Sequence, residues 1–484
     1  MGSIVLTAEQ TIQASPQDVF NMFGAGPGHG WVFDAQCDVL AVGAVVTLRV
    51  PLLGASNSGS VDILGRIVAL RPGRQIVIAH DLPWRGRLRC LFEPDGPCST
   101  RVRLVADLDG QGLEWLLRRH GWPVRDEPTT DSHRVGLLTS KSGPGSVFAT
   151  ASEYLARMAI DEINSDGGIH GRPVELMVAD DATDPAVGAS EARRLARAGC
   201  RAILASVTSA TFARAEHALR RAGVLLIHTV LNEGGRGDNW LFRLGERPLN
   251  QLTAAVPLMM RETGARRWFL IGNDYSWSHG AHYWGKLVIA RHRGVVVGER
   301  YTPLGTTNFA SLVEEIARSG AELVLSSLVG ADEVAFEREF YRAGLRDTCR
   351  TLALVLDEST RERIGDPAAT GLWTAFGYFQ QLPTSANEAF LTRYRRRFGR
   401  WAPPVSSLTE SVYEAVHLYA AAARAAREDT PPVVAESLRH LSLMVPRGEV
   451  SLSGPVDFRQ PLFVAEAVPG GYRFLTESPA DMLV

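Results

Sequence analysis

In the N-terminal part of the chain, hydrophobic and polar residues alternate with the period of two that indicates half-buried strands. Runs of this kind cover residues 4–12, 44–50, 61–70, 75–79, 88–92 and 101–108. Turn sequences at Arg71-Pro-Gly-Arg74 and Glu93-Pro-Asp-Gly96 separate the later runs, which predicts hairpins. Ser15, followed by Pro16, caps a helical run, and residues 113–120 are amphipathic. The pattern therefore predicts a curled antiparallel sheet with a helix on its concave face.

From residue 133 onward, short continuous apolar runs alternate with helical segments. The apolar runs are residues 135–138, 174–179, 202–205, 224–227, 268–271, 295–300 and 323–328. The intervening helical segments are residues 149–164, 187–198, 213–222, 252–263, 283–293 and 309–319. Such alternation predicts parallel, doubly wound α/β sheets. Because the pattern starts afresh near residue 252, we expect two lobes with a cleft between them.

A chain of 484 residues is too long for one hydrophobic core, so we divide it into domains. The predicted parts are an α+β domain at residues 1–120, a polar, proline-containing linker at 121–132, and a two-lobed α/β domain at 133–484. We expect the closing segments of the chain to cross the hinge again and complete both lobes. The lobe boundaries are about 133–250 with 382–445 for lobe 1, and about 251–381 with 446–478 for lobe 2.

The overall composition and charge limit which classes of partner and which cellular compartment are expected. The net charge of −2, with 21% charged residues, gives no electrostatic reason to expect nucleic acid or an anionic membrane as partner. The five cysteines are scattered and contain no C-x-x-C pair, which we interpret as a sign of a reducing compartment. The first residues lack the features of a signal peptide, and no run is long enough to span a bilayer. We therefore expect a cytoplasmic protein.

One aromatic turn is the centre of the predicted site. The apolar run Trp268-Phe-Leu-Ile271 stops at a polar, glycine-flanked turn that contains Tyr275 and Trp277. Ligands of open α/β sheets bind beyond the carboxyl ends of the strands, so both rings are expected to line a crevice. There they can stack on a planar ligand, and ordinary packing near the hinge is the alternative.

Hydroxyl side chains follow two strands of the first predicted lobe. Ser206, Thr208 and Ser209 lie between a strand and a helix, where hydroxyls and free N–H groups converge at the positive end of the helix dipole. That arrangement suits a carbonyl or carboxylate oxygen. Ser140, after the first strand of the lobe, has the same setting. The alternative for Ser209 is a plain N-cap.

Further candidates stand at other strand ends. His228, Thr229 and Val230 end the next strand at the same edge, although a lone histidine is often a structural residue. Asp332 and Asp357 follow strands of the second lobe, where a carboxylate can accept an amide or ammonium N–H. A helix cap is the alternative for each carboxylate.

Several motifs, in order from about residue 133 to 470, resemble the type I periplasmic-binding-protein fold. They are residues 135–143, 161–174, Thr208-Ser209, 271–275 and Gly377-Tyr-Phe379. The Gly-Asn-Asp-Tyr turn ending at Tyr275 and the Tyr-Phe pair are similar to the urea and short-chain amide branch, which implies an amide, urea or amino-acid ligand. The strand order and the Ser-Pro-x-x-Val-Phe helix of residues 1–120 resemble the START-like, polyketide-cyclase (SRPBCC) helix-grip superfamily.

The amide branch contains exported transport receptors and a cytoplasmic sensor that restrains a regulator. We therefore expect a cytoplasmic small-molecule sensor that signals to a regulatory protein partner, with no enzyme activity, cofactor, metal, nucleic acid or membrane contact. A homodimer is left open. The alternative is the substrate-binding component of an ABC transporter. A third reading is a cyclase or hydrolase in the START-like domain, with His29, His80 and Asp81 as acid-base groups.

Overall fold

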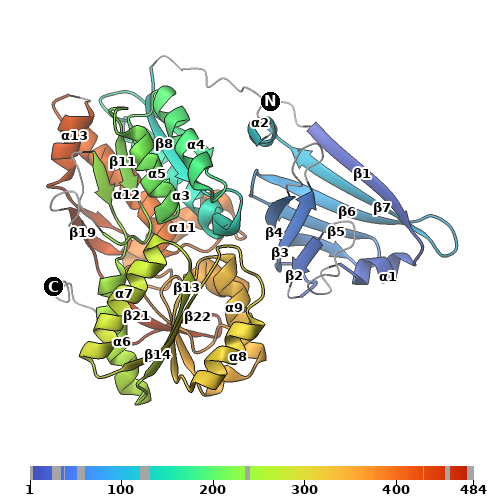
Figure 1. Ribbon diagram of the computed structural model, residues 1–484. Coiled ribbons are helices and arrows are strands. Elements are labelled where there is room, and N and C mark those ends of the chain that lie inside the picture. The colour runs from blue at the N-terminus through green and yellow to red at the C-terminus, as the bar shows by residue number, and fades with distance from the viewer. Residues whose placement is uncertain are drawn as a thin grey trace. The chain divides into compact units, whose positions relative to one another are not determined.

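The computed structural model describes residues 4–23, 34–37, 39–51, 60–119, 131–234, 240–428, 430–452 and 458–476 (Figure 1). Its chain divides into a first unit, Met1–Glu127 with Lys141–Gly143, and a second unit, Pro128–Ser140 with Pro144–Val484. Most of the predicted linker at 121–132 lies outside the described residues, as does His29. Each unit is described by itself below.

The first unit contains an antiparallel seven-stranded sheet in the order β1-β7-β6-β5-β4-β3-β2. Its strands are β1 (Ile4–Ile12), β2 (Asp34–Cys37), β3 (Val45–Pro51), β4 (Ser60–Arg71), β5 (Gln75–His80), β6 (Gly86–Pro94) and β7 (Thr100–Leu108). Two helices accompany it, α1 (Pro16–Asn21), which Ser15 caps, and α2 (Gly110–Arg119). The alternation therefore predicted every strand except the four-residue β2.

One face of this sheet is the core of the first unit. Phe20 of α1 packs edge-to-face on Phe92 of β6, with ring centroids 5.7 Å apart. Trp115 of α2 packs against Trp84 at 5.7 Å, which brings α2 onto the same face. The predicted helix on the sheet is present, but relationship to the helix-grip superfamily remains a prediction.

Lobe 1 of the second unit contains a parallel five-stranded sheet in the order β12-β11-β10-β8-β9. Its strands are β8 (His133–Thr139), β9 (Val174–Asp180), β10 (Ala202–Ser206), β11 (Leu225–His228) and β12 (Leu241–Arg243). The associated helices are η1 (Pro144–Phe148), α3 (Ala149–Ser165), α4 (Pro185–Arg197), α5 (Ser209–Leu219), α11 (Ser385–Phe398), α12 (Ser407–Ala425) and α13 (Pro431–Leu438). Strands β8, β10 and β11 are buried throughout, which explains their uninterrupted apolar runs.

Lobe 2 contains a seven-stranded sheet in the order β14-β13-β15-β16-β17-β21-β22. Its strands are β13 (Arg267–Asn273), β14 (Val295–Thr302), β15 (Leu323–Ser327), β16 (Arg350–Ala353), β17 (Trp373–Phe376), β21 (Phe463–Val468) and β22 (Gly471–Phe474). Its helices are α6 (Pro248–Thr263), α7 (Ser276–Arg291), α8 (Ala310–Ser319), α9 (Ala331–Arg342), η2 (Leu345–Asp347) and α10 (Glu358–Ile364).

The expected all-parallel sheet is wrong for lobe 2, because β21 and β22 are antiparallel to their neighbours. Only two residues, Pro469 and Gly470, join these strands, and Gly470 has a φ of 78°. A connection that short makes a hairpin, whereas parallel strands need a crossover. A small antiparallel sheet, β18 (Ser442–Val445), β19 (Gly448–Leu452) and β20 (Phe458–Arg459), completes the second unit.

Both lobes have the same strand order around their first strand. In lobe 1, β8 lies between β9 and β10, and in lobe 2, β13 lies between β14 and β15. The connections that leave the first strand on its two sides run in opposite directions, which opens a crevice at the carboxyl ends of the strands. The fold therefore places Ser140 and Ser206 at one such point, and the turn at Tyr275 at the other.

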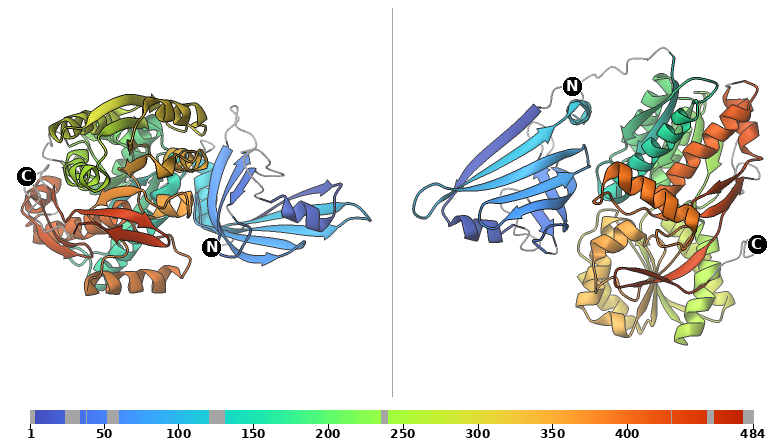
Figure 2. Two further views of the ribbon diagram at one scale, coloured as in Figure 1. Left: turned by 90° about the horizontal axis from the view of Figure 1, so that it is seen from below. Right: turned by 180° about the vertical axis from the view of Figure 1, so that it is seen from behind.

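The chain passes between the lobes before α6, after β17 and before β21. The last passage is visible as the red segment that runs from one lobe to the other in the right panel of Figure 2. One buried arginine, Arg447 in the β18–β19 turn, joins all three passages. Its guanidinium lies 3.5 Å from Glu246, which precedes α6, and donates to Gln460, which precedes β21. Glu246 in turn accepts a hydrogen bond from the N–H of Gly377, after β17, at 2.8 Å.

Lobe 1 adds two more carboxylates to this arginine. From α12, Glu410 accepts from Arg447 Nη2 at 2.6 Å and Glu414 accepts from Nε at 2.5 Å. All the charged side chains of the cluster are buried, so one guanidinium faces three carboxylates away from the protein surface. Burial raises the pKa of Glu414 well above its ordinary value. The attraction of Arg447 opposes this shift, and repulsion from Glu410 adds to it.

Replacing Arg447 by Met should leave this set of buried carboxylates uncompensated. We expect a loss of roughly 3–5 kcal/mol in the free energy of unfolding, measured by urea denaturation at neutral pH. The exposed Arg396 of α11 provides the control, since Arg396→Met should change stability by less than about 0.5 kcal/mol. Equal effects of the two substitutions would contradict the structural role of the cluster.

Candidate functional site

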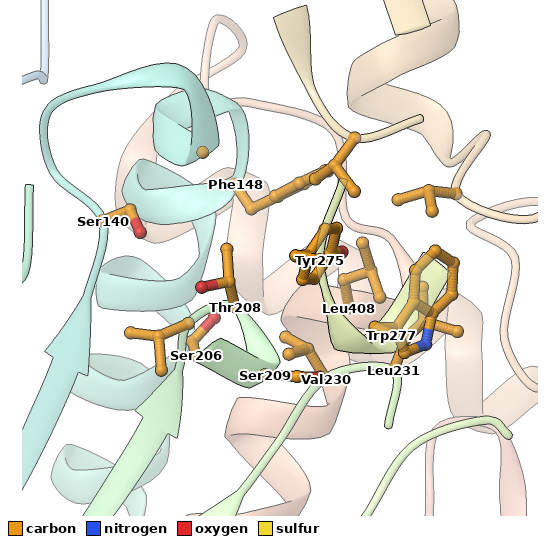
Figure 3. Close-up of a pocket in the computed structure, with 14 residues that line it drawn as sticks. Ser140, Phe148, Ser206, Thr208, Ser209, Val230, Leu231, Tyr275, Trp277 and Leu408 are labelled. Carbon is orange, nitrogen blue, oxygen red and sulfur yellow. The ribbon is translucent and has the colours of Figure 1, made fainter. Parts of the chain in front are cut away.

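A pocket lies between the two lobes of the second unit (Figure 3). It encloses about 520 Å³ of space, including the part open to solvent. The fourteen lining residues are Ser140, Gly145, Phe148, Ser206, Val207, Thr208, Ser209, Val230, Leu231, Tyr275, Trp277, Val329, Val355 and Leu408. Seven of them were predicted as ligand contacts from the sequence.

Hydroxyl groups and a helix N-terminus form the lobe 1 side of the pocket. Thr208 is the N-cap of α5 and accepts a hydrogen bond from the N–H of Thr211 at 3.3 Å. The alternative that Ser209 is a plain N-cap is therefore wrong, because Ser209 is already the first helical residue. First-turn N–H groups of a helix have no intrahelical acceptor, and the dipole makes this end positive. This side of the pocket is suited to an oxygen atom that carries negative charge.

The neighbouring hydroxyls are held by groups behind the pocket. Ser206 Oγ lies 3.4 Å from Ser152 Oγ of α3. Ser140 lies beside the buried Asp181, whose pKa is raised to about 6 by burial against the opposing hydrogen bond from Ser140. These contacts fix the positions of the hydroxyls without adding a charge to the lining.

Aromatic and aliphatic side chains form the opposite wall. Figure 3 shows Tyr275 and Trp277, from the beginning of α7, across the pocket from Ser140 and Ser206. The two rings are nearly parallel, with centroids 6.3 Å apart. Trp277 is 2% exposed, and its indole N–H has no hydrogen-bond partner among the described residues. The wall is therefore mainly aromatic and aliphatic, and the Tyr275 hydroxyl adds one polar group to it.

Two predicted contacts at the end of β11 do not line the pocket. His228 stacks on Phe212 with ring centroids 4.1 Å apart, and its Nε2 is 3.0 Å from the carbonyl oxygen of Val207. Burial lowers the pKa of His228 to about 4, so the ring is neutral. Thr229 donates to the carbonyl of Ala205 at 3.3 Å. The structural alternative considered for His228 is the one the geometry supports.

The two predicted carboxylates do not line the pocket either, and both accept hydrogen bonds from other parts of the protein. Asp332 accepts hydrogen bonds from Asn273 Nδ2 at 2.7 Å and from the N–H groups of Gly305 and Thr306. Asp357 is the N-cap of α10 and accepts from the N–H of Thr360 at 2.8 Å. Burial raises the pKa of each aspartate to about 6. Asp357 is therefore the helix cap that was its alternative, whereas Asp332 lies in the first turn of α9 and binds the loop at Gly305 instead of capping the helix.

Sequence reasoning missed seven lining residues, which are Gly145, Phe148, Val207, Leu231, Val329, Val355 and Leu408. Most are apolar residues one to three positions beyond a strand end, so the same rule that found Ser206 could have found Val207, Val329 and Val355. Leu408, at the start of α12, does not follow a strand, so the rule could not have found it. It reaches the pocket because the chain returns to lobe 1 after completing most of lobe 2.

The lobes touch through backbone at the rim of the pocket. Gly330, which precedes α9, has φ 61° and ψ −120°, and a Cβ built there would lie 2.6 Å from the carbonyl oxygen of Pro144 in lobe 1. Only glycine fits this contact without displacement. The pocket is therefore seen with its lobes closed upon each other.

A two-lobed α/β fold with an uncharged pocket between the lobes defines a small-molecule binding protein. A sequence profile described as periplasmic binding protein matches residues 132–471, and the chain belongs to this family. The two-lobed α/β fold and the binding-protein class predicted from the sequence are thereby confirmed, whereas the sheet of lobe 2 is mixed rather than all parallel.

Curated relatives and solved structures are similar to the second unit. Leu/Ile/Val-binding protein homolog 3 of Brucella melitensis is 26% identical over 218 residues, which cover 44% of this chain and 58% of the relative. The chain thus spans little more than half the length of that relative. Leu/Ile/Val-binding protein homolog 8 of Brucella abortus is 26% identical over 301 residues, or 58% of this chain and 73% of the relative.

Two solved structures share the fold. A solute-binding protein of an ABC transporter from R. palustris, in complex with benzoate, has a TM-score of 0.64 at 19% identity and covers 71% of this chain and 95% of its own. The branched-chain amino acid transporter substrate-binding protein LivJ of Streptococcus pneumoniae, in complex with isoleucine, has a TM-score of 0.64 at 19% identity, with coverages of 71% and 98%.

These comparisons overturn the expected cytoplasmic location, because the family consists of periplasmic binding proteins and the solved relatives belong to ABC transporters. The location was inferred from the absence of a leader and from unpaired cysteines. All five cysteines are indeed free. Free thiols show only that the fold needs no disulfide, so they do not define the compartment. None of the described helices is long and apolar enough to cross a membrane.

The rim contact gives a prediction about closure. Gly330→Ala places a Cβ against the Pro144 carbonyl and strains a positive φ. The closed state should therefore become less stable than the open state by roughly 1–3 kcal/mol more than in the wild-type chain. Gly344→Ala is the control, because Gly344 has a φ of 71° but nothing within 4 Å. Small-angle scattering should show a larger radius of gyration for the first variant alone. Identical scattering from both variants would contradict the rim contact.

A second prediction concerns Glu358, next to Asp357. Burial, assisted by repulsion from Asp357, raises its pKa from 4.5 to about 8. A raised folded-state pKa means that its contribution to stability is complete below pH 4.5 and is lost as the pH rises toward 8. Glu358→Gln should therefore stabilise the protein at pH 8 relative to pH 5 by roughly 1–3 kcal/mol. Exposed Glu388→Gln is the control for urea unfolding at both pH values, and a parallel response of the two variants would refute the assignment.

Proposed function

We propose that this protein is the extracytoplasmic solute-binding component of an ABC transporter and that it closes its two lobes on a small carboxylate. The observation that carries the proposal is the pocket itself, where four hydroxyl side chains and the N-terminus of α5 face a largely apolar aromatic wall. A negative charge fits the first side because the first-turn amides of α5 lack intrahelical acceptors and the helix dipole is positive at this end. An apolar substituent fits the second side.

The relatives support a carboxylate rather than another anion. One solved relative holds benzoate, another holds isoleucine, and the curated relatives are named for leucine, isoleucine and valine. All these molecules carry a carboxylate attached to an apolar body. An amide or urea, the ligand class favoured by the aromatic turn at Tyr275, presents one carbonyl oxygen to the same donors and is therefore included in the test.

Calorimetry with the full chain should detect binding of at least one of benzoate, L-isoleucine, acetamide and urea. Thr208→Val removes a hydroxyl of the pocket lining, and this loss should weaken binding by about 1–3 kcal/mol, or roughly 5- to 150-fold. Thr384→Val is the matched control, because Thr384 caps α11 in the same manner but does not line this pocket. Unaltered affinity in the Thr208 variant, or no binding by any of the four compounds, would count against the proposal.

A further inference from the structure

One edge of the sheet in the first unit is long and has no neighbouring strand. Strand β1 (Ile4–Ile12) pairs with β7 over all nine residues without a bulge, and among the described residues no strand pairs with its other side (Figure 1). Such an edge presents a row of backbone N–H and C=O groups to solvent, which makes it a template for another strand. No residue of β1 lines the pocket of the second unit, so this edge concerns a property other than ligand binding.

The sequence of β1 lacks the features that usually protect a sheet edge. Those features are short length, several charged residues, proline or a bulge. β1 contains one charged residue, Glu9, and no proline. The other long edge strands of the described sheets, β9 and β14, each contain two charged residues, and β2, at the opposite edge of the same sheet, has four residues. Nothing in the sequence of β1 therefore opposes pairing with another chain.

Exposed apolar side chains accompany the exposed backbone. Ile4, Val5 and Leu6 follow one another on β1 and are 42%, 54% and 47% exposed. Successive side chains of a strand point to opposite faces of the sheet, so neither face is covered at this end of β1. A run of three exposed apolar residues is unfavourable in water unless it meets a partner. The side chains and the backbone of β1 thus both favour an interaction.

The strand is suited to antiparallel pairing with the same strand of a second copy. In an antiparallel edge strand, every second residue directs its N–H and C=O outward, so two copies can pair only when residues of the same parity face each other. A register centred on Ala8 meets this condition and pairs all nine residues, with Ile4 opposite Ile12. It also keeps the core-facing side chains of both sheets on the same face of the joined sheet.

Charge favours this register over its neighbour. With Ala8 opposite Ala8, Glu9 faces Thr7 of the second copy, and Arg103 of its own copy lies 3.6 Å away. Shifting the register by two residues, to a centre on Glu9, would place two carboxylates directly opposite each other, which is unfavourable. We propose that two copies of this protein associate through antiparallel pairing of their β1 strands, centred on Ala8, so that two seven-stranded sheets become one.

Analytical ultracentrifugation of the full chain should show a monomer–dimer equilibrium at micromolar concentrations. Leu6→Lys adds a charge to the pairing strand and should weaken dimerisation at least about tenfold. Leu287→Lys is the matched control, because Leu287 of α7 is 48% exposed but belongs to the second unit. A wild-type chain that remains monomeric would overturn the proposal, whatever else the edge might bind. Equal effects of the two substitutions would overturn it as well.

A cysteine at Ala8 tests the register itself. Residues directly opposite each other in an antiparallel pair have Cα atoms about 4.5–5.5 Å apart, which is within the range of a disulfide bond. Ala8→Cys, in a Cys98→Ser background that removes an exposed native thiol, should therefore give a disulfide-linked dimer on oxidation with diamide. Val5→Cys in the same background is the control, because Val5 lies opposite Thr11 and far from its own counterpart. Absence of the linked Ala8→Cys dimer, or equal linkage of both variants, would refute the proposed pairing.

Discussion

The buried charge of Arg447 is the constraint on which the two-lobed unit depends. Its guanidinium contacts Glu246 and Gln460 from two passages between the lobes, and Glu246 binds the third at Gly377. Such a cluster contributes little net stability when intact, since desolvation offsets attraction, but it is costly to disrupt. We interpret it as a device that fixes where the three passages meet, so that the lobes have one common axis.

With the passages fixed, the site follows from sheet topology. The same strand order in both lobes places a crevice at the ends of β8 and β10 on one side and of β13 and β15 on the other. Neither lobe alone contains both the hydroxyl side and the aromatic wall. Binding therefore requires the lobes to approach, and the backbone contact between Pro144 and Gly330 shows how closely they do so.

Local pattern predicted much of this architecture and part of the site. Apolar runs located the buried strands, and the strand-end rule found Ser206, Thr208 and Trp277, because the carboxyl edge of a parallel sheet is the same in every such fold. It failed where tertiary partners decide the outcome. His228 stacks on Phe212, and Asp332 accepts a hydrogen bond from the loop at Gly305. The local sequence does not reveal partners that are so distant along the chain. The antiparallel direction of the β21–β22 hairpin was not predicted, because a short apolar strand has the same sequence pattern in a parallel and in an antiparallel sheet.

The uncharged lining has a consequence for how the protein meets its solute. Dipoles and hydroxyls act over a few ångströms, whereas a charged pocket attracts ions over a Debye length of about 10 Å at moderate salt. A net charge of −2 on the whole chain provides no long-range attraction for an anion either. The solute therefore arrives by diffusion alone, and its capture should be nearly independent of the salinity of the surroundings.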